Sequence, residues 1–403
     1  MPTEKLYFQD SHLASFHGRV LRVAQFHESP SLVLDRTVFY PEGGGQLGDR
    51  GTLSISGTPI AVVDVQIDDA GDIHHLIGEL PSSDVVGAVA SGEIDAKRRR
   101  DFMSQHTAQH MLSCTLLEIA RAETVSSRLG SEVSTIDIDV ANLREELALR
   151  AEDRVNDVVL EDRPVRTLFP TEGELGKLPL RRPPKVEDGV RIVQVEGFDL
   201  SPCGGTHCTR TGEVGMVRVV GLERYKGGTR VTFVAGRRAL EDYRRKDRLL
   251  LDLARSFSCG VEGVPTAVAK LRSDLKSRTE AFASARGELM AMLGERLLAG
   301  HPADPSGTTR IVIERDGDDV GTMRALASAL SRRADVVALV ASRAAEGEGW
   351  LVVIERGESA SFDAGAWLKA RTATHGGRGG GRADRAEGKL PATVSWKSVA
   401  SET

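Results

Sequence analysis

The stretch KRRRDFMSQHTAQHMLSCTLLEIARA, residues 97–122, combines a helical pattern with two histidines. His106 and His110 recur with apolar residues at steps of three and four, which predicts an amphipathic helix. Because side chains four residues apart project from the same face of a helix, both imidazoles point the same way. Such a pair, taken alone, is more often an ordinary surface or core pair than a metal site.

A second pair follows further along the chain, in SPCGGTHC, residues 201–208. Cys203 and His207 are again four apart, here on a turn in which Gly204 and Gly205 allow close approach without a Cβ clash. Imidazole and thiolate are preferred zinc ligands, and two such pairs can converge on one tetrahedral ion. The conjunction of the two motifs predicts one zinc ion held by four residues: His106, His110, Cys203 and His207.

Four protein ligands raise a question about what the ion does. They would close a tetrahedral zinc site, whereas a hydrolytic zinc needs a position for water or substrate. The sequence also contains no HExxH arrangement that would add a glutamate base. Either one of the four residues gives way to water, or the coordination expands, or the metal orients the substrate. The residues leave these three readings open.

Working outward, residues 1–92 predict a small all-β barrel, with a sandwich as the alternative. Val- and Ile-rich segments such as GRVLRVAQF and PIAVVDVQI are separated there by Gly, Pro, Ser or Asp. The segment PEGGGQLGDRG, residues 41–51, has too much glycine for a plain turn. His74 and His75 are neighbours in a predicted strand, so they point to opposite faces, and we interpret them as structural.

A basic cluster, Lys97–Arg100, comes directly before the histidines. Its plain interpretation is a solvated helix start. Cations at a helix N-terminus oppose the helix dipole, however, which favours a functional use such as phosphate binding.

The remainder of the chain predicts three further domains, giving an α+β multidomain fold. Residues 93–236 mix helices with strands such as RIVQVEGF and TRVTFVAG. Residues 237–300 are entirely helical, with a heptad seam after Pro265 that indicates a helical hairpin or coiled-coil arm. Residues 301–403 alternate buried-type strands with a helix, which predicts a small α/β domain. The seam residues are Val268, Leu271, Leu275, Phe282, Leu289 and Met292.

Composition places the chain among ordinary globular proteins. Its 403 residues have a formal net charge of −5, so nucleic-acid binding would depend on local patches. No apolar run is long enough to span a membrane, and the N-terminus does not resemble a secretory signal. The four cysteines show no framework spacing, which suits the cytoplasm, and we interpret Cys114 and Cys208 as structural.

Taken in order, DRTVFYPEGGGQLGDRG (35–51), SQHTAQHMLS (104–113) and SPCGGTHC resemble the editing domain of alanyl-tRNA synthetases and their freestanding relatives, the AlaX proteins. HGGRGGGRADRAEGK (375–389) is similar to the glycine-rich signature of the synthetases' C-terminal domain. HxxxH and CxxxH are weak patterns alone, but four motifs in this order are very specific. The chain looks like the long form of AlaX, with editing domain, helical linker and C-terminal domain.

The resemblance implies a zinc-dependent hydrolase that deacylates mischarged alanine tRNA, with serine as the main expected target and glycine as a second. The zinc ligands would be the four residues above. Thr37 and Gln46 match positions of interest in the family. A site that hydrogen-bonds the serine hydroxyl rejects alanine well, which fits the Thr37 side chain. Gln46 would position the water or the ester carbonyl, and the Gly43, Gly44 and Gly45 backbone would approach the terminal adenosine and stabilise an oxyanion.

The resemblance also implies that the C-terminal domain binds tRNA, and a basic glycine cluster fits that use. Alanine activation with ATP is not expected, because only about ninety residues read as β-structure precede the HxxxH helix. Three alternatives remain: an editing enzyme for another tRNA such as threonine tRNA, a tRNA-binding or regulatory protein with a purely structural zinc, and a phosphoesterase. A homodimer through the helical arm or the C-terminal domain stays open. The proposed RNA-binding residues are Arg378, Gly379, Gly380, Gly381 and Arg382.

Overall fold

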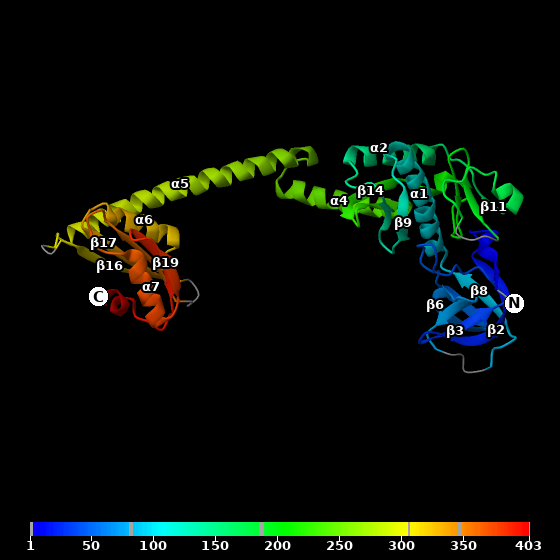
Figure 1. Ribbon diagram of the computed structural model, residues 1–403, viewed down its shortest axis with the longest axis horizontal. Coiled ribbons are helices and arrows are strands. Elements are labelled where there is room, and N and C mark those ends of the chain that lie inside the picture. The colour runs from blue at the N-terminus through cyan, green and yellow to red at the C-terminus, as the bar shows by residue number, and fades with distance from the viewer. Residues whose placement is uncertain (1–2, 80–83, 185–188, 305–306, 345–348, 403) are drawn as a thin grey trace. The chain divides into compact units, whose positions relative to one another are not determined.

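The computed structural model describes residues 3–79, 84–184, 189–304, 307–344 and 349–402. They form two compact units, Met1–Asp252 and Leu253–Thr403 (Figure 1). The predicted mixed α+β architecture with a β-barrel is confirmed. The division into domains 1–92, 93–236, 237–300 and 301–403 stays a prediction. Among the described residues, no helix has both the length and the apolar character needed to cross a membrane.

Six strands close into a barrel in the order β2-β3-β7-β6-β5-β8, so the sandwich alternative is wrong. In β2 the buried Phe16, Gly18 and Val20 alternate with exposed residues, because successive side chains of a strand point to opposite faces. A Cβ on Gly92 would lie 2.1 Å from Cε1 of the Phe16 ring, so the ring packs where a larger residue at position 92 would place its side chain. The barrel strands are β2 (Ser15–Phe26), β3 (Ser29–Leu34), β5 (Gly51–Ile55), β6 (Thr58–Ile67), β7 (Ile73–Ile77) and β8 (Val89–Ile94).

The glycine-rich segment leaves the barrel between β4 (Arg36–Thr37) and β5. The short strand β1 (Glu4–Lys5) pairs with β4 in parallel, and the 3-10 turn η1 (Leu6–Phe8) follows it. Residues 4–8 and 40–46 therefore lie at the same end of the barrel. This end faces the second half of the unit.

The histidine stretch forms the helix α1 (Ala96–Ala120), as predicted. Asp95 caps its N-terminus by accepting hydrogen bonds of 3.0 Å from the amides of Lys97 and Arg98. The amphipathic interpretation is wrong, because the polar side of the helix is buried as well as the apolar side. The buried polar residues include Gln105, His106, Thr107, Gln109, His110 and Ser113.

The basic cluster before the histidines is tied to the barrel, which overturns the phosphate interpretation for two of its members. Arg99 is 2% exposed and pairs with the equally buried Asp49. Arg98 donates to the carbonyl of Gly48 at 2.9 Å and packs over the Phe102 ring. These arginines bind the barrel to the start of α1.

Two sheets and a second helix complete this unit around α1 (Figure 1). A four-stranded antiparallel sheet has the order β14-β15-β10-β9, and a three-stranded sheet has the order β11-β12-β13. Helices α1 and α2 share a core with the first sheet. The elements are β9 (Thr124–Leu129), β10 (Ser134–Ile138), α2 (Glu145–Leu160), β11 (Val165–Leu168), α3 (Glu172–Leu175), β12 (Ile192–Val195), β13 (Asp199–Pro202), η2 (Thr211–Val214), β14 (Val217–Tyr225) and β15 (Gly228–Ala235).

Two long helices follow, as the sequence predicts: α4 (Gly236–Ser256) and α5 (Val264–Ala299), with the turn η3 (Val261–Gly263) before α5. Pro265 lies in the first turn of α5. Most of the predicted heptad seam is solvent-exposed in this chain, including Leu275, Phe282 and Met292. The seam is therefore not covered by the described part of the chain, and a coiled-coil partner stays a prediction.

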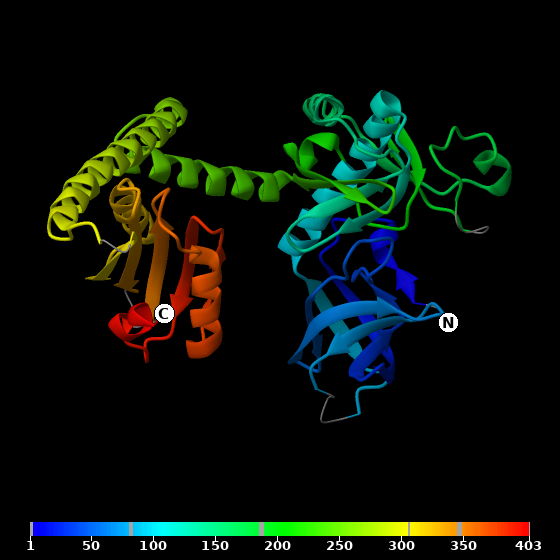
Figure 2. The ribbon, with the colours of Figure 1, turned by 60° about the vertical axis from the view of Figure 1, so that its left-hand side comes forward.

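The second unit is a five-stranded sheet in the order β16-β17-β18-β20-β19, with helices on both faces (Figure 2). Only β16 and β17, which flank α6, are parallel, so the sheet is mixed rather than the parallel one that a βαβ alternation favours. Strand β17 is buried on both faces, as its run of apolar residues predicts. The elements are β16 (Thr309–Asp316), α6 (Val320–Ser331), β17 (Val336–Arg343), β18 (Trp350–Arg356), α7 (Ala364–His375), β19 (Arg378–Gly381), β20 (Arg385–Leu390) and α8 (Trp396–Ser401).

The C-terminal glycine cluster forms an exposed edge strand, β19. Close packing accounts for two of the strand's glycines, because a Cβ on Gly381 would lie 2.1 Å from the carbonyl oxygen of Arg385 and a Cβ on Gly379 would lie 2.9 Å from that of Glu387. A Cβ on Gly380 would meet no described atom within 4 Å. Arg378 and Arg382 are exposed at the two ends of this segment. Their use in RNA binding stays a prediction.

Candidate metal centre and its cavity

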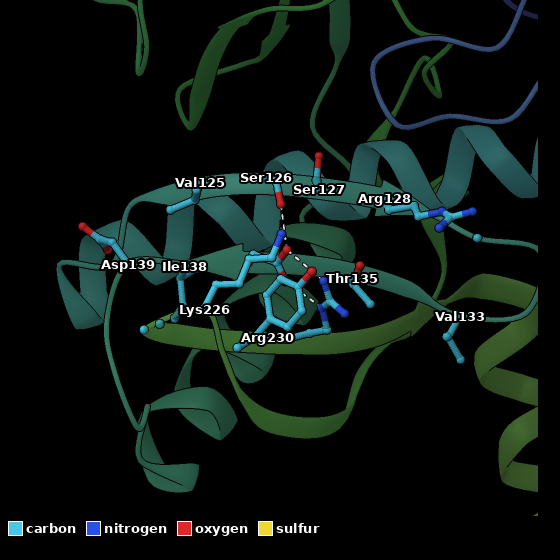
Figure 3. Close-up of a pocket in the computed structure, with 15 residues that line it drawn as sticks. Val125, Ser126, Ser127, Arg128, Val133, Thr135, Ile138, Asp139, Lys226 and Arg230 are labelled. Carbon is cyan, nitrogen blue, oxygen red and sulfur yellow. Dashed lines mark hydrogen bonds and ion pairs between the residues drawn. The ribbon is translucent and has the colours of Figure 1, made fainter.

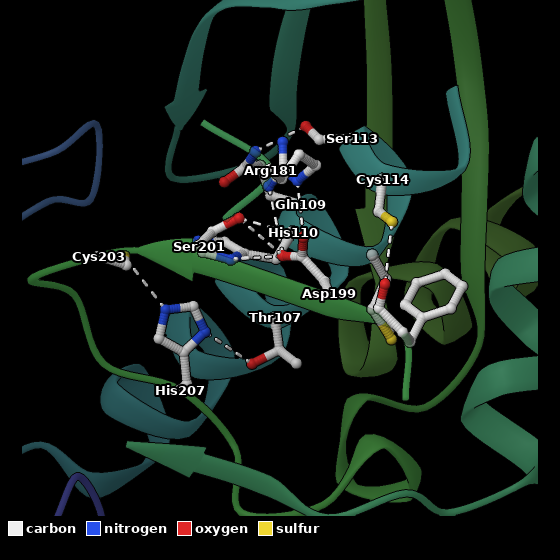
Figure 4. Close-up of polar contacts among 12 residues, drawn as sticks. Thr107, Gln109, His110, Ser113, Cys114, Arg181, Asp199, Ser201, Cys203 and His207 are labelled. Atoms are coloured by element: carbon white, nitrogen blue, oxygen red, sulfur yellow. Dashed lines mark hydrogen bonds and ion pairs between the residues drawn. The ribbon is translucent and has the colours of Figure 1, made fainter. Parts of the chain in front are cut away.

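The two histidine and cysteine motifs meet in the first unit. His106 and His110 lie on α1, and Cys203 and His207 lie on the turn after β13. Figure 4 shows His110, Cys203 and His207. One potential ligand atom from each of the four residues lies within 4.8 Å of the other three. His106 Nε2 and His207 Nε2 are 3.4 and 3.3 Å from the Cys203 sulfur. The predicted convergence is confirmed, and the group could hold one metal ion.

The ring nitrogens show that the residues fit a metal. Each histidine has its Nδ1 beside a polar partner: Gln46 for His106, Asp199 for His110 and Thr107 for His207. The Nε2 of His110 is buried and has no hydrogen-bond partner among the described residues. Histidine ligands commonly bind a metal through one nitrogen while the other bonds a protein acceptor, and an unpaired buried nitrogen is otherwise costly.

Asp199 anchors the His110 end of the centre. Its carboxylate accepts from Arg181 Nε at 2.7 Å and from the Ser201 hydroxyl at 3.1 Å, and it lies 3.3 Å from His110 Nδ1 (Figure 4). The Arg181 and Ser201 hydrogen bonds fix the carboxylate, which in turn fixes the imidazole ring. Burial raises the pKa of the Asp199 carboxyl, but the hydrogen bonds and charges of His110 and Arg181 outweigh it and hold that pKa well below its ordinary value.

At Cys203 and His207 the electrostatics favour the protonation states that a metal requires. Burial raises the pKa of the Cys203 thiol, but the rings of His106, His207 and His110 outweigh it and hold that pKa well below its ordinary value. Burial, together with the His106 ring, lowers the pKa of His207 well below its ordinary value. A thiolate and a neutral imidazole are the forms that bind zinc. Burial lowers the pKa of His110, but Cys203 and Asp199 outweigh it, so that pKa lies above its ordinary value.

Gln46 faces this centre, and both polar atoms of its amide form hydrogen bonds. Its Oε1 lies 2.9 Å from His106 Nδ1 and accepts from the amide of Thr206 at 3.2 Å. Its Nε2 donates to the hydroxyl of Thr206 at 2.8 Å. The side chain is completely buried. Gln46 therefore connects the glycine-rich segment of the barrel to both metal-binding motifs.

Gly205 is the glycine that this arrangement requires. A Cβ at this position would lie 2.1 Å from Cε1 and 2.4 Å from Nδ1 of the His106 ring. A Cβ on Gly204 would meet no described heavy atom within 4 Å. The expectation that both glycines bring the turn close to the ion is thus refined, because only Gly205 packs against a ligand.

A cavity of about 730 Å³ opens beside the centre. The Gly43–Gly45 backbone, His106, Cys203 and Gly205 all line it. Tyr7, Phe8 and Tyr40 add an aromatic wall, in which the Tyr7 ring stands edge-on to the other two. The glycine-rich loop thus reaches the site, as predicted. Gly44 and Gly45 have positive φ angles of 59° and 88°, and a Cβ on Gly45 would lie 2.4 Å from the Ser127 carbonyl oxygen.

A larger hollow of about 930 Å³ lies on the four-stranded sheet (Figure 3). Ser126, Ser127 and Arg128 on β9, with Lys226 and Arg230 nearby, line it. Arg230 is already paired with Asp137, at 2.7 Å. The described lining of this hollow contains no histidine or cysteine, so the chemistry belongs to the smaller cavity. The two share Val125, Ser126 and Ser127, so they adjoin.

Thr37 is not brought to the cavity lining. Its hydroxyl is completely buried, 2.7 Å from His75 Nε2, and accepts from the amide of Phe39 at 3.0 Å. The other His75 nitrogen lies 3.0 Å from the carbonyl of Leu32, so it donates there and Nε2 accepts from Thr37. Burial lowers the pKa of His75 to about 4, which keeps the ring neutral. His74 bonds Ser31 and Asp68, consistent with a structural role for both histidines.

Comparisons with known proteins agree with this arrangement. Residues 10–98 match the family described as tRNA synthetases class II (A), and residues 190–232 match the threonyl and alanyl tRNA synthetase second additional domain. Residues 307–400 match the DHHA1 domain. The alanine–tRNA ligase of Korarchaeum cryptofilum is 32% identical over 406 residues, covering 97% of this chain and 44% of the relative. The chain is an AlaX-like relative of alanyl-tRNA synthetase.

Other relatives of this AlaX-like chain match in the same way. The alanine–tRNA ligase of Methanopyrus kandleri is 30% identical over 96% of this chain and 42% of the relative. The chain thus spans less than half the length of these relatives. Among solved structures, the C-Ala domain from Aquifex aeolicus alanyl-tRNA synthetase matches 23% of this chain and 84% of that chain, at 25% identity and a TM-score of 0.21.

Sequence reasoning on the AlaX-like chain missed three residues that support the centre. Asp199 could have been suspected, since it alternates with Ser201 in the buried strand that leads into Cys203. Thr107 lies beside a ligand on α1, and hydroxyl residues on a helix give no signal of their own. Arg191 is 5% exposed and donates to the carbonyls of Cys203 and Gly205, both at 2.8 Å.

The structure predicts that Gln46 of the AlaX-like chain acts through His106. We expect Gln46→Met to lower metal affinity by roughly 10- to 100-fold, the usual effect of removing a hydrogen-bond partner of a metal ligand. Zinc competition with a chromophoric chelator measures this affinity. If Gln46 instead positions water or the ester carbonyl, the variant keeps its zinc affinity and loses only rate.

Proposed function

We propose that this chain is a trans-editing hydrolase that cleaves the aminoacyl ester of mischarged alanine tRNA, with seryl-tRNA as the main substrate and glycyl-tRNA as a second. The observation that carries the proposal is the group His106, His110, Cys203 and His207, two of whose members, His106 and Cys203, line a cavity that a glycine-rich loop also lines. The alanyl-tRNA synthetase relatives support the choice of tRNA. We also place the protein in the cytoplasm, where that tRNA is used.

The four residues would hold one zinc ion. When bound, zinc supplies Lewis acidity and a lowered pKa for a coordinated water. The Gln46 amide keeps His106 Nδ1 engaged, so that the opposite nitrogen faces the group. Asp199 and Thr107 hold the other two rings in the same way.

The cavity wall supplies binding for the 3′ end of tRNA. Tyr7, Phe8 and Tyr40 offer aromatic surface for the terminal adenine, since every base has a face that can stack. The Gly43 amide donates to the Gln46 carbonyl at 3.0 Å, so it is not available to the substrate. Among the described residues, the amides of Gly44 and Gly45 have no partner. We propose that these two stabilise the developing oxyanion.

One observation favours a second candidate, a tRNA-binding or regulatory protein with a structural zinc. Four protein ligands close a tetrahedral site, and such closed sets are typical of structural zinc. Catalysis at this centre needs one ligand to yield to water, an expanded coordination, or a metal that orients the substrate. The two candidates differ in whether the zinc-loaded protein hydrolyses the ester.

The deciding experiment measures deacylation of alanine tRNA charged with serine, glycine or alanine. With zinc-loaded protein we expect serine to be released at least roughly 100-fold faster than alanine, because a buried polar partner is left unpaired by alanine. Stripping the zinc with a chelator should abolish release, and adding zinc back should restore it. Threonine tRNA charged with serine serves as the control, because it carries the same amino acid on a different tRNA.

If zinc-loaded protein binds alanine tRNA and hydrolyses none of the three esters, the structural-zinc candidate replaces the enzyme. Faster release from the threonine tRNA would support the editing enzyme for another tRNA. Thr37→Val in the same assay tests the selective role of that hydroxyl, which must exchange its His75 partner to reach a substrate. An equal effect of this variant on serine and alanine would contradict the selective role.

A further inference from the structure

Arg191 is a buried cation at the cavity wall that forms no salt bridge with any residue the structure describes. Its Nη1 donates to the carbonyls of Cys203 and Gly205, and its Nη2 lies 3.2 Å from the Thr167 hydroxyl. All three acceptors are neutral. Its Nε is buried and has no hydrogen-bond partner among the described residues. Buried charges in proteins are normally paired, so this arrangement leaves a positive charge to be matched.

Two further cations line the same cavity. The Lys5 ammonium lies 5.4 Å from the centre of the Phe8 ring, and the Arg191 guanidinium lies 5.2 Å from the same ring. Arg182 lines the cavity and donates to the carbonyl of Pro202 at 3.3 Å. Burial lowers the pKa of Lys5.

The described lining offers little to balance these charges. Glu42 is its one carboxylate, and that group accepts from Gln66 at 3.3 Å. The Cys203 thiolate is committed to the metal group. Among the described lining residues, three cations against one carboxylate give the cavity a positive field, and a water-poor site makes such a field stronger than it would be at an open surface. The natural partner for this field is an anion that arrives with the ligand.

We propose that Lys5, Arg182 and Arg191 form an anion subsite that takes the phosphodiester linking the last two nucleotides of an RNA 3′ end. The inference rests on the proposed function, in which an aminoacyl ester enters this cavity. An amino acid attached as an ester has lost its carboxylate and carries a positive amino group. The nearest anion in such a substrate is therefore the terminal phosphodiester, while the base stacks on the Tyr7, Phe8 and Tyr40 wall.

The test is a double-mutant cycle between protein and RNA. The probe is an uncharged RNA hairpin with a single-stranded CCA end, in which the last phosphodiester is either normal or replaced by a neutral methylphosphonate. Lys5→Gln is the main variant, because Lys5 does not contact the metal motifs in the described structure. Loss of a charge-assisted contact should weaken binding by roughly 10-fold, measured by fluorescence anisotropy.

The expected result is coupling. The methylphosphonate and Lys5→Gln together should weaken binding by clearly less than the product of their separate effects. Lys5→Gln should also reduce the salt dependence of log affinity by a slope of roughly 0.7. Arg182→Gln should show the same coupling to the methylphosphonate and the same reduction in salt dependence. Arg144→Gln, which removes an exposed cation of the same unit, and a methylphosphonate placed in the duplex should show no coupling.

Independent effects of Lys5→Gln and the terminal methylphosphonate would overturn the subsite. The binding assay needs no hydrolysis, so the two proposals fail separately. A protein that deacylates seryl-tRNA but shows no coupling lacks the subsite and keeps the function. A protein that shows coupling but hydrolyses no ester has the subsite as an RNA-binding site and loses the proposed function. Zinc content, measured for every variant, shows that the metal group is intact.

Discussion

Gly205→Ala is expected to remove the metal centre while leaving the fold in place. The new Cβ would lie 2.1 Å from Cε1 of His106, the ring atom between the two nitrogens. The ring cannot move aside without losing its Gln46 hydrogen bond and turning its other nitrogen away from the group. Displacing a ligand should cost more than removing its hydrogen-bond partner, so we expect metal affinity to fall by more than about 100-fold.

The chain supplies a matched control for this prediction in the adjacent residue. A Cβ on Gly204 meets no described heavy atom within 4 Å, and Gly204 has no positive φ angle. Gly204→Ala should therefore keep full zinc content. Zinc stoichiometry by elemental analysis, with circular dichroism as the check on folding, compares the two variants. Equal zinc content in both would show that the loop relaxes easily and that Gly205 is not required.

Periodicity and spacing predicted most of the fold and the grouping of the four metal-binding candidates. They worked because each signal is local: four residues make one helical turn, and the period of two in β2 gives one buried face. The residues of α1 form a helix, as predicted, but the prediction that this helix is amphipathic was wrong. Polar residues along one side of a helix normally indicate that this side faces water. In α1 the polar side instead faces Asp199, Gln46 and the turn after β13.

Long-range pairing was the part that the sequence could not predict. Gln46 reaches Thr206 across 160 residues and Thr37 reaches His75 across 38, and no periodicity encodes either contact. Both side chains were expected to face a substrate, and both have their hydrogen-bonding groups occupied by protein partners. Arg191 was invisible for the same reason, because an isolated arginine at the start of a strand gives no sign of burial.

The second large effect is expected at the buried pair between Arg99 and Asp49. Both side chains are 2% exposed, and Arg99 also donates to the carbonyls of Ser11 and Val38, at 2.7 and 2.5 Å. Asp49→Ala would leave the guanidinium buried without a counter-charge, which typically costs about 3–5 kcal/mol. We expect the first unit to unfold at markedly lower urea concentration, as followed by native-state hydrogen exchange of peptides from α1 and the barrel.

The chain again supplies controls. Asp72→Ala breaks the partly exposed pair with Arg22 on the same barrel and should cost less than about 1 kcal/mol. All three tryptophans, Trp350, Trp367 and Trp396, lie in the second unit, so its unfolding, followed by tryptophan fluorescence, should not change. Replacing both partners, as Asp49→Leu with Arg99→Met, should be less harmful than Asp49→Ala, because no buried charge is then left unpaired. If the double variant loses as much unfolding free energy as the Asp49→Leu and Arg99→Met single variants together, packing rather than charge makes this contact necessary.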